Sequence, residues 1–166
     1  EELSRVYTGS AGKINPFFLM VGCEAHLGEY YEGLNSAAVL GELLRLAEGN
    51  PDLADEGGGE AFTPFACMKH RDLRGEYSAS IPERSVAYFS YFTASKTPSQ
   101  IVEVLRSLAL EAQRNALARQ EDASARFAAR GKPRVHERRR EARVMTFEEL
   151  LAKARGRLGS EADVLV

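Results

Sequence analysis

Apolar residues along the chain gather in short runs typical of strands and in longer stretches with helical spacing. The run 17–21 is continuous and stands between Pro16 and Gly22, a pattern typical of a buried strand. Two later stretches, 62–68 and 85–93, are rich in aromatic and β-forming residues, and the side chains of the second alternate in character. These three stretches are predicted strands.

Two helices are expected between and after these strands. In the stretch 33–48, leucines and alanines recur at helical spacing, and Asn35 or Ser36 can cap its start. The residues at 97–100 form a capping box with proline at the first helical position, followed by apolar residues on one face. Beyond Ala118 this second helix becomes charged and alanine-rich, which predicts last turns that face solvent or a partner.

The remaining stretches complete a fold class. Val144 and Met145 suit a short fourth strand, and 146–149 is a second capping box that opens a helix ending at Gly159. The acidic, glycine-rich stretch 52–60 is expected to be a loop. This order predicts an α+β fold, a ferredoxin-like two-layer sandwich in which an antiparallel sheet of about four strands carries two helices on one face, plus an extra C-terminal helix.

Composition places the chain among single globular domains. Its 166 residues, 44% of them hydrophobic, are enough to form a core, and the formal net charge of −2 favours no particular partner. No apolar run is long enough to span a bilayer, and the start lacks the order of a signal peptide. We therefore expect a cytoplasmic protein with no membrane partner, whose two cysteines suit a reducing compartment.

Two Cys-x-x-His pairs raise the question of a zinc site. Cys23 with His26 and Cys67 with His70 have a donor set and spacing that tetrahedral zinc accepts. However, the stretch 67–70 is expected to leave a strand, where alternation scatters side chains over both faces. Two core thiols are the preferred interpretation, so no metal or other cofactor is expected in this chain.

A basic cluster at 132–143 raises the question of a nucleic-acid partner. Its lysine and arginines could follow a phosphate backbone. Glu137 and Glu141 interrupt the cluster, and no aromatic residue stands among the basic ones for base stacking. A solvated or partner-facing segment is the favoured interpretation, and no nucleic acid is expected as a partner.

The stretch 21–28, continued at 33–37, resembles the lid-domain signature of the M20 metallopeptidases and aminoacylases. In that signature a glycine and then an Ala-His or Ser-His follow the first strand, and a Gly-x-Asn-Ala opens the first helix. Further matches resemble the arginine-utilisation branch of the family, and the similarity extends from about Tyr7 to Leu151. These matches are Asn50-Pro51-Asp52-Leu53, Gly59-Glu60, Lys69, Asp72-Leu73, Tyr77 and the strand 85–93 followed by Thr97-Pro98.

The resemblance implies a lid and dimerisation domain, with residues 1–166 forming one such domain of a larger two-domain hydrolase. In such enzymes a separate catalytic domain binds two zinc ions, and the lid forms the homodimer. The lid histidine, which matches His26, reaches the partner's active site and donates a hydrogen bond to the scissile carbonyl oxygen. By itself the chain is expected to catalyse nothing, because the metal ligands belong to its own catalytic domain outside these residues.

Two further residues have a weaker place in the resemblance. Asn35 matches a helix-opening asparagine that touches substrate, although N-capping accounts for it equally well. The substrate-binding arginine that many M20 lids carry near the end of the third strand has no clear counterpart, and Lys96 is the one candidate substitute. Peptidase and deacylase activities both stay open. The alternative function is a freestanding ferredoxin-like module that binds a small ligand.

Overall fold

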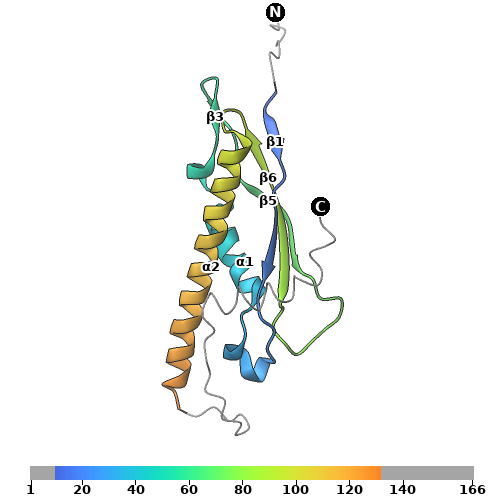
Figure 1. The fold of residues 1–166 in the computed structure, drawn as a ribbon, viewed down its shortest axis with the longest axis vertical. Helices are drawn as coiled ribbons and strands as arrows, with labels where there is room; N and C mark the ends of the chain where they lie inside the picture. Colours follow the sequence, from blue (N-terminus) through green and yellow to red (C-terminus); the bar gives the residue numbers. More distant parts are fainter. Residues whose placement is uncertain (1–9, 132–166) are drawn as a thin grey trace, which may run out of the picture.

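The structure is a computed structural model that describes residues 10–131, with 1–9 and 132–166 outside the described part. The described residues form an α+β sandwich in which α1 (Ser36–Ala47) and α2 (Pro98–Ala128) cover one face of an antiparallel sheet (Figure 1). The predicted fold class is confirmed. The strand expected at 144–145 and the helix expected at 146–159 lie outside the described residues.

The sheet is built around its longest strand, β6 (Arg84–Thr93). On one side β6 pairs with β5 (Ala66–Asp72), and on the other with β1 (Gly12–Ile14) and β2 (Phe17–Val21), which follow one another along the same edge. Every pairing is antiparallel. The strand β1 was not predicted, because three residues of mixed polarity carry no clear alternation.

The core lies between the sheet and the two helices. Ala87, Phe89 and Tyr91 alternate along β6 on the buried side, each at most 1% exposed. They meet Leu43 of α1 and Ile101 of α2 in one continuous hydrophobic cluster. The predicted alternation of 85–93 is therefore confirmed, and it orients the even-numbered residues of β6 toward the uncovered face of the sheet.

The prediction of a strand at 62–68 is wrong in its bounds, because the strand occupies Ala66–Asp72. Phe65 is 2% exposed and supplies the apolar signal, but it precedes the strand and stacks on Tyr91 with ring centroids 4.2 Å apart. The strand itself is an edge strand of mostly exposed polar residues, and such a strand has little apolar pattern to reveal it.

The expected loop 52–60 contains short elements. A 3-10 turn, η2 (Pro51–Leu53), precedes a small hairpin of β3 (Glu56–Gly57) and β4 (Glu60–Ala61). Its turn residues Gly58 and Gly59 have φ of 63° and 84°, the left-handed region that favours glycine in tight hairpins.

Both helix starts agree with their predicted caps. Asn35 caps α1, and Thr97 with Gln100 forms the capping box of α2. The last turns of α2 are mostly exposed, as expected, and they also contact this chain at two points: the Gln120 amide donates to the Gly33 carbonyl, and Phe127 contacts the ring of Tyr31. No helix in residues 10–131 is long and apolar enough to cross a membrane.

Candidate functional site

The segment between β2 and α1 is a closed loop whose neck is a pair of backbone hydrogen bonds. Cys23 and Leu34 each donate an N–H to the other's carbonyl, both at 2.8 Å. A Cβ on Gly22 would lie 2.1 Å from the Leu34 oxygen, and one on Gly33 would lie 2.5 Å from the Cys23 oxygen. The two glycines of the signature are therefore explained by close backbone approach at the neck.

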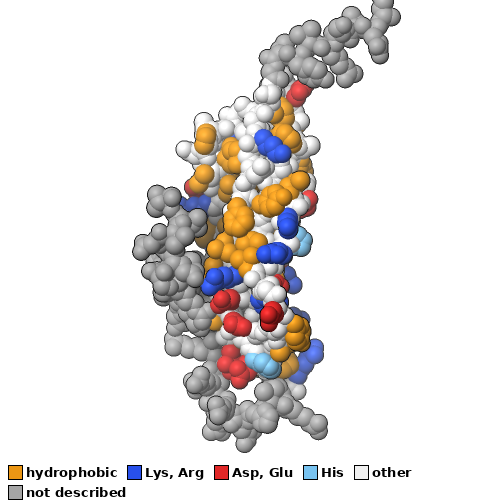
Figure 2. All heavy atoms as spheres, turned by 90° about the vertical axis from the view of Figure 1, so that its right-hand side faces the viewer, with side chains coloured by type: hydrophobic (Ala, Val, Ile, Leu, Met, Phe, Trp, Pro, Cys, Tyr) orange, Lys and Arg blue, Asp and Glu red, His pale blue; other side chains and the backbone are white. Residues whose placement is uncertain are grey.

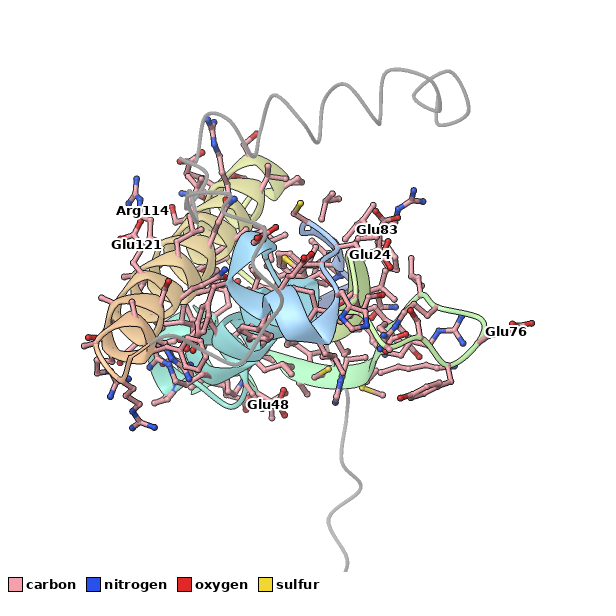
Figure 3. All side chains as sticks on the ribbon, turned by 90° about the horizontal axis from the view of Figure 1, so that it is seen from below. Glu24, Glu48, Glu76, Glu83, Arg114 and Glu121 are labelled. Carbon is pink, nitrogen blue, oxygen red and sulfur yellow. The ribbon has the colours of Figure 1, made fainter. Side chains whose placement is uncertain are left out.

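A second loop, 73–83 between β5 and β6, supports the first. The Leu27 N–H donates to Ala79 and the Ile81 N–H donates to Ala25, both at 2.9 Å, which places Ser80 opposite His26. The Ser80 hydroxyl also donates to the carboxylate of Glu24. Figure 3 shows Glu24 and Glu83 close together at this end of the sheet, with Glu76 at the far tip of the second loop.

His26 stands at the start of η1 (Leu27–Glu32), a 3-10 segment within the first loop, and its side chain is exposed. Its Nδ1 accepts a hydrogen bond of 3.1 Å from the N–H of Gly28. An accepting Nδ1 cannot carry a proton, so the neutral ring assigned by this hydrogen bond carries its proton on Nε2. No described residue bonds Nε2, and the side chain therefore offers one outward donor.

Asn35 lies near the neck of this loop and is half buried. Its Oδ1 accepts a hydrogen bond of 2.9 Å from the N–H of Ala37, so its carbonyl is engaged in capping α1. This geometry accounts for the asparagine structurally. Its amide nitrogen is the group that remains for a ligand.

Arg74 is a cationic residue at the same end of the sheet that sequence reasoning missed. Its guanidinium donates to the Ser80 carbonyl at 2.7 Å and to the Asp72 carboxylate at 3.0 Å. The Arg74 guanidinium holds the pKa of the Asp72 carboxyl below its ordinary range. A basic residue in a polar turn gives no signal of its own, and only the spacing from Asp72 could have indicated the pair.

Lys96, the candidate substitute for the lid arginine, is a structural residue at the opposite end of β6. Its ammonium donates to the Ala54 carbonyl at 2.8 Å and to the Tyr91 hydroxyl at 3.0 Å, and it lies 3.6 Å from the carboxylate of Asp55. Because the Lys96 ammonium already has these three partners within the fold, its role in this structure is structural.

Asp55 is the centre of that corner and is 2% exposed. Its oxygens accept hydrogen bonds from the backbone N–H groups of residues 56 and 94–96 and from the hydroxyls of Thr93 and Ser95. Burial alone would raise the pKa of Asp55, but these donors, led by the Lys96 N–H, lower it far below its ordinary value. The carboxylate fastens the β3–β4 region to the end of β6.

A second buried carboxylate, Glu42 of α1, pairs with two arginines. Arg45 donates to it at 2.9 Å from the same helix, and Arg119 donates from α2. The Arg45 guanidinium, together with that of Arg119, lowers the pKa of Glu42. This pair fastens the two helices together.

The two Cys-x-x-His pairs also have definite places. Cys67 and His70 lie inside β5, so the expectation that this stretch leaves a strand is wrong. A bulge at Met68 sets Cys67 opposite Phe89 and His70 opposite Ala87, which puts both on the helix side. Burial raises the pKa of the Cys67 thiol, which disfavours the thiolate that binds metal. Within residues 10–131 no three His, Cys, Asp or Glu side chains gather as a metal site.

Comparison with known proteins adds two similar sequences from Bacillus subtilis (strain 168). No family model matches the chain. The uncharacterized protein YqjN is 30% identical over 153 residues, which is 92% of this chain and 28% of YqjN. Protein RocB is 29% identical over 109 residues, which is 66% of this chain and 19% of RocB. The chain thus spans less than a third of the length of these curated relatives and is similar to one part of longer proteins.

Proposed function

We propose that this chain is the lid and dimerisation domain of an M20-type amidohydrolase or peptidase, and that His26 acts in the active site of the partner subunit. The observation that carries the proposal is the geometry of His26. Its side chain is exposed, its Nδ1 accepts the Gly28 N–H, and its Nε2 makes no bond to a described residue. A histidine with that arrangement keeps one hydrogen-bond donor available to a group outside its own domain.

Three observations support the wider assignment. The chain is similar to parts of two longer proteins, YqjN and RocB, as expected for one domain of a larger protein. Gly22 and Gly33, two positions of the M20 lid signature, stand where any side chain would collide with backbone. The order of the described elements is that of a ferredoxin-like sandwich.

The proposed role of His26 is electrostatic. During attack on an amide, negative charge develops on the carbonyl oxygen, and a donor already in place stabilises that charge without reorganising. The Gly28 N–H holds the imidazole in the tautomer that can donate, and the loop 73–83 fixes the backbone that carries it. We assign two zinc ions, which would polarise the carbonyl and activate water, to the part of the longer protein outside this chain.

The proposed homodimer uses the outer edge of β5. Among the described strands β5 pairs only with β6, so its other edge offers the outward-facing backbone donors and acceptors of a seven-residue strand. Two such edges can pair around a two-fold axis and continue the sheet. Sedimentation of the longer protein as a strict monomer at high concentration would contradict this part of the proposal.

The test uses the longer protein and follows amine release from N-acyl amino acids and dipeptides. His26→Ala is expected to lower kcat by about a hundredfold to a thousandfold, the usual cost of removing one such donor. His70→Ala is the matched control, because His70 is also exposed but lies in β5, and its kcat should be unchanged. Sedimentation of both variants separates a lost donor from a lost dimer. Unchanged turnover of His26→Ala would refute the proposal.

A further inference from the structure

The face of the sheet that no described helix covers is unusually apolar. By strand register, Phe17 and Leu19 of β2 lie beside Tyr88 and Val86 of β6 on this face. Phe17 is 65% exposed, Leu19 44% and Tyr88 40%. Scattered apolar residues are normal on a protein surface, but a contiguous group of large ones marks an interaction surface.

The charged residues that the described strands place on this face all have one sign. Lys69 and Arg71 of β5 lie opposite Tyr88 and Val86, and the Lys13 ammonium stands 5.9 Å from the ring centroid of Phe92. No Asp or Glu occurs among the described strand residues on this face. Its members are Lys13, Phe17, Leu19, Val21, Ala66, Lys69, Arg71, Arg84, Val86, Tyr88, Ser90 and Phe92.

The surface is also hollowed. A depression of about 150 Å³ on this side is lined by Phe17, Lys69, His70, Arg71, Val86, Ala87 and Tyr88. Figure 2 shows this side of the molecule, where hydrophobic side chains lie along the middle with basic ones beside them and acidic ones mostly below. An occupant that fits would bring an apolar side chain to the hollow and carboxylates to its basic rim.

We propose that this uncovered sheet face is the docking surface for another part of the same longer polypeptide, an apolar patch bordered by carboxylates. The inference rests on the proposed function, in which the chain is one domain of a larger enzyme. The relative YqjN aligns over 92% of this chain, yet more than two thirds of YqjN lies outside the match, so a longer polypeptide of this kind has residues enough to supply such a patch.

Charge argues against a second copy of this chain as the occupant. If two such faces met, Lys69 and Arg71 of one would oppose the same cations of the other without an intervening carboxylate, which repels. A single-stranded nucleic acid would also meet aromatic rings and cations here. The favoured partner is the polypeptide because the hollow is lined by Phe17, Val86 and the stems of cationic side chains, which suit an apolar side chain better than a base.

The first measurement compares acetylation of lysines in the chain alone and in the longer protein, read by mass spectrometry. Lys69 and Lys13 should be modified several-fold more slowly in the longer protein. Lys96, already engaged inside the fold, should react slowly in both. Equal rates for Lys69 in the two proteins would overturn the proposal.

The second measurement uses charge reversal. The double variant K69E/R71E of the longer protein should restore fast acetylation of Lys13, whereas R114E, on the outer side of α2 (Figure 3), should not. Two results would overturn the proposal. One is a wild-type chain that binds a labelled oligonucleotide of about 15 nucleotides and loses it in K69E/R71E. The other is a dimer of the chain that Phe17→Glu, on β2 and away from the β5 edge, dissociates. If Lys69 is protected in the longer protein but the His26→Ala substitution leaves kcat unchanged, only the catalytic role of His26 is refuted.

Discussion

Two polar sites at opposite ends of β6 use their hydrogen bonds in opposite ways. At the end of the strand, Asp55 is buried and each of its oxygens accepts several donors from residues 93–96 and Glu56. At the beginning of the strand, His26 is exposed, and of its two ring nitrogens only Nδ1 is bonded by a described residue.

This difference distinguishes a residue that stabilises the fold from one that is available to a ligand. A buried carboxylate is tolerated only when donors replace its lost water, so saturation is typical of a structural role. A side chain whose backbone is firmly fixed while its tip stays unbonded has its strongest donor available to something outside the domain. Lys96 belongs to the first kind, although the resemblance made it the candidate substitute for the substrate-binding lid arginine.

The largest effect is expected from Asp55→Ala. Removing the carboxylate leaves backbone N–H groups buried without acceptors, and the free energy of unfolding should fall by about 3 to 5 kcal/mol. Urea unfolding followed by circular dichroism measures this loss. Lys96→Met should cost clearly less, since the other donors to Asp55 remain. A loss within about 1 kcal/mol for Asp55→Ala would contradict the structural role.

Acid should weaken the fold through the same group. The folded pKa of Asp55 lies below its ordinary value of about 4, so its contribution is complete above that pH and is lost as the pH falls toward the folded pKa. Glu42 acts in the same direction. The free energy of unfolding should therefore decrease as the pH falls below about 4. Asp55→Asn should make this dependence on pH less steep. An unchanged slope in this variant would show that other carboxyls control the acid response.

The neck of the His26 loop gives a smaller effect with an internal control. Gly22→Ala places a Cβ 2.1 Å from a backbone oxygen and should cost about 2 to 4 kcal/mol. Gly41→Ala in α1 meets no atom within 4 Å and should stabilise by about 0.5 to 1 kcal/mol. Thermal unfolding compares the two, and equal shifts would show that the neck is not tight.

The smallest effect on folding is expected from His26→Ala in this chain. The ring is exposed and makes one local hydrogen bond, so the free energy of unfolding should change by less than about 0.5 kcal/mol. A larger loss in urea unfolding would show that His26 helps to hold the fold and would weaken the contrast with Asp55.

Much of the fold was predictable because its signals are local. The caps at Asn35 and Thr97 and the alternation along 85–93 depend on neighbours in sequence. The bounds of β5 were not predictable, because an edge strand with exposed Lys69 and His70 has no apolar pattern. The path of α2 beyond Ala118 depended on Gly33 and Tyr31, which are distant in sequence.

The site was predictable only in part. The resemblance indicated His26. The structure adds the tautomer of its ring and the backbone hydrogen bonds that hold its loop, and no sequence pattern contains either. Asn35 was equally well explained by capping, and the capping bond is present. The hydrogen bonds of Arg74 and of Lys96 join different loops. A sequence does not reveal such contacts, because the two partners have no fixed spacing along the chain.

Subunit mixing tests the central claim most directly. Longer-protein subunits carrying His26→Ala are combined with subunits that lack a metal ligand of the catalytic domain, each kind being inactive alone. If His26 acts across the dimer, one of the two sites in each heterodimer combines an intact metal centre with an intact histidine, and activity should return on mixing. No recovery in a preparation whose heterodimers are proven by mass spectrometry would contradict the account.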